Sequence, residues 1–202
     1  MKKTIVMMLA CAAPVFAGEP AAVAPVPAPA PAPAVNPWSY ELGVSYSWAS
    51  TDAVKNSSFD KLQTIGVDLT ACYAMDENNS VNLRFGYGWG DSSDAEGTKL
   101  HAHTWTLMPG YRYTCPLDDT WSVYAGANIG VAASAWKLHD HGWHAHASDW
   151  GFAYSAELGV RYALCPNSEL FLGYIFSGNT AKPTGCEAQV NHGIRAGVGM
   201  KF

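Results

Sequence analysis

Residues 81–90 read VNLRFGYGWG, a strict alternation of large apolar side chains with small or polar ones. Such alternation indicates a β-strand with one apolar and one polar face. The apolar phase contains Phe85, Tyr87 and Trp89, whereas the other phase contains glycines and Arg84. The fold depends on how often this alternation recurs along the chain and on which of the two faces is buried.

The alternation recurs in eight segments. They begin at Trp38, Ile65, Val81, Trp105, Trp121, Trp150, Leu170 and Val190. Short turns near 76–79, 116–119 and 166–168 alternate with longer polar loops near 50–60, 90–99, 137–149 and 178–188. Pro109 interrupts the fourth segment and suggests a bulge there. Short connections on one side and long ones on the other are typical of an outer-membrane barrel. The sequence therefore predicts an all-β fold, a closed antiparallel up-and-down transmembrane β-barrel of about eight strands.

The apolar phase is expected to face outward. An eight-stranded barrel has an interior just wide enough for ordinary side chains, so the many aromatic residues of this phase would overfill it. The glycines, serines, asparagines and threonines of the other phase suit a narrow lumen. Only lipid makes an apolar outer surface acceptable. After residues 1–17 no apolar run is long enough for a transmembrane helix.

The N-terminal residues predict an exported protein. Lys2 and Lys3 precede a short apolar run, so residues 1–17 are expected to form a signal peptide. Residues 18–37 are rich in alanine and proline and are expected to form an extended periplasmic spacer. The barrel is then expected to span residues 38–202. The formal net charge is −5, and loss of Lys2 and Lys3 makes it more negative, which argues against nucleic acid as a partner.

The C-terminal segment carries a resemblance. Arg195, Gly197, Met200 and Phe202 place a polar residue, a glycine and two hydrophobic residues at the spacing of an outer-membrane assembly signal. Residues 38–202 resemble the OmpA-type and opacity-type eight-stranded barrel family. The resemblance implies insertion into the outer membrane by the barrel-assembly machinery, contact with outer-membrane lipid and no catalytic residues. Roles in that family range over adhesion, envelope stability and small pores.

The inward phase contains charged residues that must pair if they are buried. We predict a barrel-interior charge network of Glu41, Asp68, Arg84, Arg112, Glu157, Arg161 and Arg195. As a structural plug this network would fill the lumen, which is the interpretation we favour because eight strands leave little space. The alternative is a narrow, gated pore.

Cysteines and histidines supply two further candidate sites. If a disulfide forms, the expected pair is Cys115 and Cys165, and the alternative is that all the cysteines are free. Closely spaced imidazoles can ligate zinc or copper, so weak metal binding is a second hypothesis, against that of a polar surface loop. The candidate ligands are His101, His103, His139, His141, His144 and His146. No other cofactor is expected.

We therefore expect a monomeric, non-enzymatic outer-membrane barrel with a structural or surface-interaction role, such as adhesion to a surface ligand or the cell wall. A narrow diffusion pore is the first alternative. A lipid-modifying outer-membrane enzyme is the second, because His144, His146, Ser148 and Asp149 supply the residue types of a hydrolytic site.

Overall fold

A computed structural model of the protein describes residues 36–49, 62–93, 99–140, 143–181 and 189–201. The predicted signal peptide and nearly all of the predicted spacer lie outside these residues. None of the described residues form a helix that is long and apolar enough to cross a membrane.

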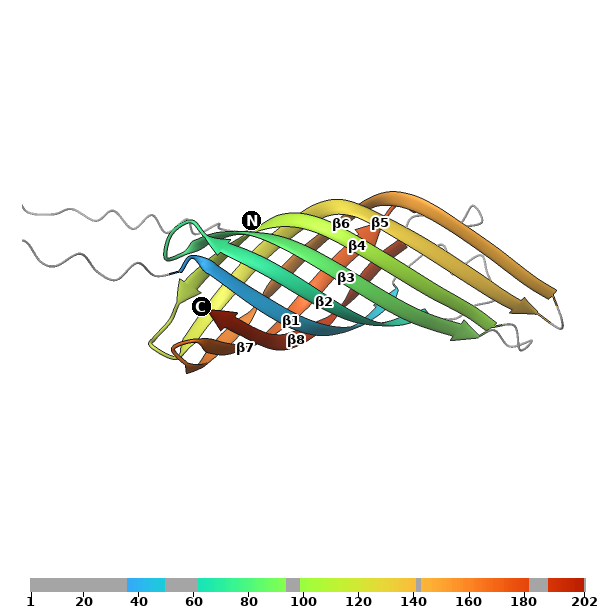
Figure 1. Cartoon of the computed structure of the whole chain (residues 1–202). Helices are drawn as coiled ribbons and strands as arrows, with labels where there is room; N and C mark the ends of the chain where they lie inside the picture. The colour runs from blue at the N-terminus through green and yellow to red at the C-terminus, as the bar shows by residue number, and fades with distance from the viewer. Residues whose placement is uncertain (1–35, 50–61, 94–98, 141–142, 182–188, 202) are drawn as a thin grey trace, which may run out of the picture. The chain divides into compact units, whose positions relative to one another are not determined.

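Eight antiparallel strands form a closed barrel (Figure 1). They are β1 Trp38–Ala49, β2 Gln63–Ala74, β3 Asn79–Ser93, β4 Lys99–Pro116, β5 Trp121–Asp140, β6 Trp143–Cys165, β7 Ser168–Asn179 and β8 Gln189–Lys201. Each strand pairs with the next in the chain, and β8 closes the barrel on β1 through pairs such as Gly43 with Gly197. The predicted fold class is confirmed.

The two ends of the barrel differ. One end, called the turn end below, carries the short connections 75–78, 117–120 and 166–167 and the end of β8 (Figure 1). At the opposite end, called the loop end, the β3–β4 and β5–β6 hairpins reach furthest. Strands β5 and β6 have 20 and 23 residues, whereas a transmembrane strand needs about 9–11. These two strands therefore continue well beyond one membrane thickness.

The prediction of a long loop at 137–149 was wrong. Strands β5 and β6 pair without interruption as far as Asp140 and Trp143, so their connection is only residues 141–142. The polar composition of this segment suggested a loop. However, continued pairing satisfies the backbone N–H and C=O groups of both strands, and a polar face is no obstacle outside the lipid. We call the paired segment 134–149 the outer hairpin.

The predicted bulge at Pro109 was also wrong. The register of β4 against β5 is the same before and after this residue, with Leu107 opposite Val131 and Gly110 opposite Asn128. Proline lacks an N–H group, so it removes a hydrogen bond from the ladder, yet it leaves the register unchanged. The irregularity lies instead between Ala163 and Cys165, where β6 meets β7.

The outward face is apolar on every strand. Leu42 is 57% exposed and Trp150 is 74% exposed, and similar values hold for large apolar residues around the barrel. The inward face holds glycines, hydroxyl residues and charged residues, most of which are buried. This arrangement is the reverse of a soluble protein and requires lipid around the barrel. The outward phase turns polar on the outer hairpin, where Lys137 and Ser148 are exposed.

Candidate functional site

The seven charged residues predicted for the interior all lie inside the barrel and are buried. They project from β1, β2, β3, β4, β6 and β8 because each occupies the inward phase of its strand. Together with the three partners described below, they form a single connected set of ion pairs and hydrogen bonds. We call this set the charge network.

Arg195 is the centre of the charge network, and none of its surface is exposed. Its Nε donates to Asp68 Oδ1 at 2.9 Å, and its Nη2 donates to Asp68 Oδ2 at 2.5 Å. Its Nη1 donates to Glu157 Oε1 at 3.0 Å, and its Nη2 lies 3.6 Å from Glu41 Oε2. One guanidinium therefore links three carboxylates, and its contact with Asp68 is bidentate, which fixes both groups.

Glu41 and Glu157 connect the remaining arginines. Arg112 donates to both oxygens of Glu41, with Nη2 2.9 Å from Oε2, and Arg161 Nη2 donates to Oε1. Arg84 Nη2 donates to Glu157 Oε2 at 2.5 Å. Each of these two carboxylates thus contacts at least two guanidinium groups, which compensates for its removal from water.

Sequence reasoning missed three members of the charge network. Glu169 pairs with Arg161 and with Lys201 Nζ, the latter at 3.3 Å. Tyr124 donates from its hydroxyl to Glu157. The ring of Phe171 lies 4.4 Å from the Arg195 guanidinium carbon, a cation–π contact. The alternation of β5 and β7 contained the signal, since all three residues lie in the phase opposite to the lipid-facing one.

The charges inside the barrel balance. Four carboxylates, from Glu41, Asp68, Glu157 and Glu169, meet four guanidinium groups, from Arg84, Arg112, Arg161 and Arg195. With Tyr124, every one of the eight strands contributes at least one side chain. A neutral set in which each charged group contacts a group of opposite charge lowers the cost of burying charge.

Two glycines make room for these contacts. A Cβ atom at Gly43 would lie 2.8 Å from both Arg195 Nε and Asp68 Oδ1. A Cβ atom at Gly173 would lie 2.5 Å from the Tyr124 hydroxyl. The small inward residues are therefore the spaces that the long charged side chains of the facing strands occupy.

The charge network separates two cavities in the lumen. The loop-end cavity has a volume of about 130 Å³ and reaches Asp68 and Arg84 of the network. The turn-end cavity has a volume of about 300 Å³ and reaches Arg112, Arg161 and Glu169. Side chains of the network thus form the floor of one cavity and the roof of the other.

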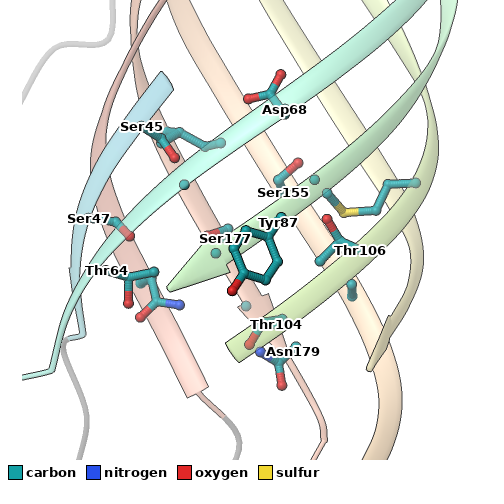
Figure 2. Close-up of a pocket in the computed structure, with 18 of the residues that line it drawn as sticks. Ser45, Ser47, Thr64, Asp68, Tyr87, Thr104, Thr106, Ser155, Ser177 and Asn179 are labelled. Atoms are coloured by element: carbon teal, nitrogen blue, oxygen red, sulfur yellow. The ribbon is translucent and has the colours of Figure 1, made fainter. Parts of the chain in front are cut away.

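Seven serine and threonine residues contribute hydroxyl groups to the lining of the loop-end cavity, beside glycines and apolar side chains. Figure 2 shows them around one space, with Asp68 at one end and Asn179 at the other. They are Ser45, Ser47, Thr64, Thr104, Thr106, Ser155 and Ser177. This half of the lumen therefore combines hydroxyl groups with apolar surface and is almost free of charge, apart from the network residues at its floor.

The disulfide prediction is corrected by the structure, in which Cys115 and Cys165 are both free thiols. Cys115 lies at the end of β4 and Cys165 at the end of β6, with β5 between them. Neighbouring strands are about 4.8 Å apart, so two intervals exceed the roughly 7 Å reach of a disulfide. Cys72 instead contacts the charge network, because its Sγ accepts a hydrogen bond from Arg112 Nη1 at 3.5 Å.

The described histidines contact acidic and aromatic neighbours. His101 Nδ1 forms a contact with Asp91 Oδ1. His103 Nδ1 lies 2.7 Å from the Tyr87 hydroxyl. The side chains of His139, His144 and His146, and the whole of His141, lie outside the described residues. Among the described residues, no group of three or more possible ligands forms a metal site. Metal binding by the outer hairpin stays a prediction.

Two residues of the hydrolytic alternative, Ser148 and Asp149, have described side chains, whereas those of His144 and His146 lie outside the described part of the chain. Ser148 and Asp149 are consecutive in β6, so their side chains point to opposite faces of the sheet. Asp149 Oδ1 accepts a hydrogen bond from the Trp150 backbone N–H at 2.9 Å. Ser148 and Asp149 therefore do not belong to one catalytic triad.

The C-terminal signal residues have separate structural positions. Arg195 is inside the barrel, and Met200 is 52% exposed on the outward face. A Cβ atom at Gly197 would lie 2.5 Å from the Phe171 ring, so glycine leaves space for that ring. Phe202 lies outside the described residues, and its role in assembly stays a prediction.

A closed barrel with an apolar exterior and a polar, charge-balanced interior defines a transmembrane β-barrel protein. Residues 5–202 match the model of the outer membrane protein beta-barrel domain, and the chain belongs to that family. The protein is therefore located in the outer membrane of a Gram-negative cell envelope. In such barrels the short turns face the periplasm, so the turn end is the periplasmic end.

Solved structures with the same fold include two outer-membrane barrels. Neisserial surface protein A has a TM-score of 0.60 and 16% identity, over 84% of this chain and 99% of that one. Ail, the attachment invasion locus protein of Yersinia pestis, was crystallised with the heparin analogue sucrose octasulfate. It has a TM-score of 0.55 and 17% identity, over 82% of this chain and 97% of that one. No curated protein matches the chain.

Proposed function

We propose that this protein is a non-enzymatic barrel whose lumen is closed and which acts at the cell surface through its outer hairpin. The observation that carries the proposal is the charge network. It receives a side chain from every strand and lies between the two cavities. A barrel blocked in this way is suited to a structural or surface-interaction role rather than to transport.

The outer hairpin supports the surface role. It extends the β5–β6 pair past Trp150, the last large apolar residue on the outward face of β6. Beyond this level the outward face is polar, with Lys137 and Ser148 exposed. A paired two-stranded extension presents a rigid surface to a partner at a lower entropic cost than a disordered loop does.

The surface role is tested by shortening the outer hairpin. A variant would join Trp136 to Ala147, which are register partners, through an Asn-Gly turn. Cells carrying the full-length chain or the variant would be incubated with immobilised heparin, used because Ail was crystallised with a heparin analogue, and with cell-wall fragments. We expect the full-length chain to increase binding to one of these surfaces and the variant to lose that increase.

The controls separate folding from binding. Both proteins should migrate differently on denaturing gels with and without heating, because a closed barrel resists detergent until it is heated. Equal binding by the two folded proteins would contradict a role for the outer hairpin. The absence of binding by the full-length chain to all the surfaces would contradict the adhesion proposal itself.

The second candidate function is a narrow pore, which is favoured by the presence of a cavity on each side of the charge network. Single-channel recording in planar bilayers distinguishes the two. We expect no steady conductance from the unmodified protein, because the paired side chains of Arg195 and Glu157 obstruct the lumen. Regular unitary currents from the unmodified protein would replace the closed-barrel proposal with the pore.

A further inference from the structure

The loop-end cavity contains buried polar groups without partners. Arg84 is 3% exposed and lines this cavity. Only its Nη2 is bonded to Glu157, and its Nε and Nη1 have no hydrogen-bond partner among the described residues. The Oδ1 atom of Asn191, another lining residue, is also unpartnered. Buried polar groups are normally satisfied, so these atoms need a partner that both accepts and donates hydrogen bonds, a role that water or a small ligand can fill.

The charge balance restricts the ligand to a neutral molecule. Asp68 and Glu157 offset Arg84 and Arg195 at the floor of the cavity, and the rest of the charge network is balanced as well. An added anion or cation would therefore be buried without a counter-charge, which is strongly unfavourable. A neutral ligand adds no such cost.

The shape and lining indicate a small polyol. The cavity volume is about 130 Å³, and a cavity of roughly 150 Å³ holds a molecule the size of benzene. Hydroxyls such as those of Thr106 and Ser155 can both donate and accept, as polyol hydroxyls do. Met108 and Ala153 provide an apolar surface for the carbon chain.

We propose that the loop-end cavity binds a small neutral polyol of about the size of glycerol, with the Arg84 guanidinium donating to a ligand hydroxyl. The ligand hydroxyls in turn donate to acceptors such as Asn191 Oδ1. This binding site goes beyond the surface role and does not rest on it, because it uses the lumen rather than the outer hairpin. Affinity in the millimolar range is expected, since so small a ligand makes few contacts.

Solution NMR on the folded, full-length barrel in detergent micelles tests this proposal. The Nε–Hε signal of Arg84, identified with the Arg84→Lys variant, would be followed during titration with glycerol. Acetate and methylammonium would be titrated as the anionic and cationic comparisons. We expect a saturable shift with glycerol and no saturable shift with either ion.

Two variants fill the cavity with larger side chains, one from β4 and one from β6. Ala102→Leu and Ala153→Val change buried lining residues outside the charge network, whereas Ala127→Leu alters an exposed lipid-facing residue as the matched control. We expect a loss of glycerol affinity of at least about tenfold in a folded cavity variant and none in the control. A shift that never saturates, or that both cavity variants retain, would overturn the site. Tighter saturation by acetate would overturn the neutral-ligand assignment.

Discussion

The two halves of the lumen follow the same strand alternation and yet are built differently. In the half toward the turn end, long charged side chains cross the lumen and pair with carboxylates on distant strands, as Arg195 does with Asp68. In the half toward the loop end, hydroxyl side chains such as Thr106 and Ser155 leave a cavity. In the first half, ion pairs fix the positions of the side chains, so these residues should contribute most to the stability of the barrel. In the second half, contacts between side chains contribute less to stability, and the cavity is available for a ligand.

The strongest test of this difference is Arg195→Ala. The change leaves Asp68 buried without its cation and removes one cation from Glu157, so we expect a loss of about 3–5 kcal/mol in the free energy of unfolding. Urea unfolding of the barrel in lipid vesicles would measure it. Lys201→Ala is the control, because Lys201 is paired to the same network but is 58% exposed and should cost less than about 1 kcal/mol. Equal losses would contradict the central place of Arg195.

A pair of identical substitutions compares the two halves directly. Thr70 is fully buried, donates to Asp68 Oδ2 at 3.3 Å and accepts from Arg195 Nη2 at 3.4 Å. Thr70→Val should therefore cost about 1.5–3 kcal/mol, since hydrogen bonds to charged groups are lost. Thr106→Val in the loop-end cavity should cost less than about 1 kcal/mol. The same unfolding measurement applies, and a larger effect at Thr106 would reverse the comparison.

A smaller effect is expected from Phe171→Leu, which keeps an apolar side chain but removes the ring beside Arg195. A desolvated cation–π contact contributes about 1–2 kcal/mol, so the free energy of unfolding should fall by that amount. Phe152→Leu is the matched control on the lipid-facing surface, where Phe152 is 49% exposed. If the two variants lose the same amount, lipid-facing packing rather than the arginine contact explains the change.

The smallest expected effect concerns pH at the turn end. Hydrogen bonds from the backbone N–H groups of Trp121 and Thr120 lower the pKa of Asp118 below its ordinary value. A lowered carboxyl pKa means that this turn gains stability above the ordinary pKa and loses it as pH falls through the lowered value. The amide signal of Thr120 should move over that acidic range, and Asp118→Asn should abolish the movement. An unchanged titration in the variant would assign the movement to another group.

The sequence predicted which residues face the lumen but not how they meet. Alternation assigns Glu41 and Arg195 to the inward phase without fixing the stagger of the strands, and the stagger decides which side chains lie at the same height. Glu169 was missed because it lies beside a turn in a strand whose phase was blurred by Phe171. The inward position of Phe171 is explained by its contact with Arg195, a partner that only the closed barrel provides.

Two errors at the strand ends arose because the sequence does not show how the strands pair. The histidine-rich segment suggested a loop because it is polar. Outside the lipid, however, a polar segment can form a paired strand, because its side chains face water. Cys115 and Cys165 were expected to be close because both lie beside short turns at the same end of the predicted barrel. Strand β5 lies between them, and the spacing of residues in the sequence does not show the resulting distance.

The charge network also constrains the order of assembly. Glu41 is on β1 and Arg195 is on β8, the first and last strands of the chain, whose pairing closes the barrel. In an open sheet already inserted in lipid, Arg195 would be separated from Asp68 and Glu41, and only its contact with Glu157 of β6 would lie on the same side of the seam. Such half-closed intermediates are therefore penalised, and closure of the β1–β8 seam and completion of the ion pairs become a single cooperative step. The same residues that block the lumen thus favour all-or-none insertion of the barrel into the membrane.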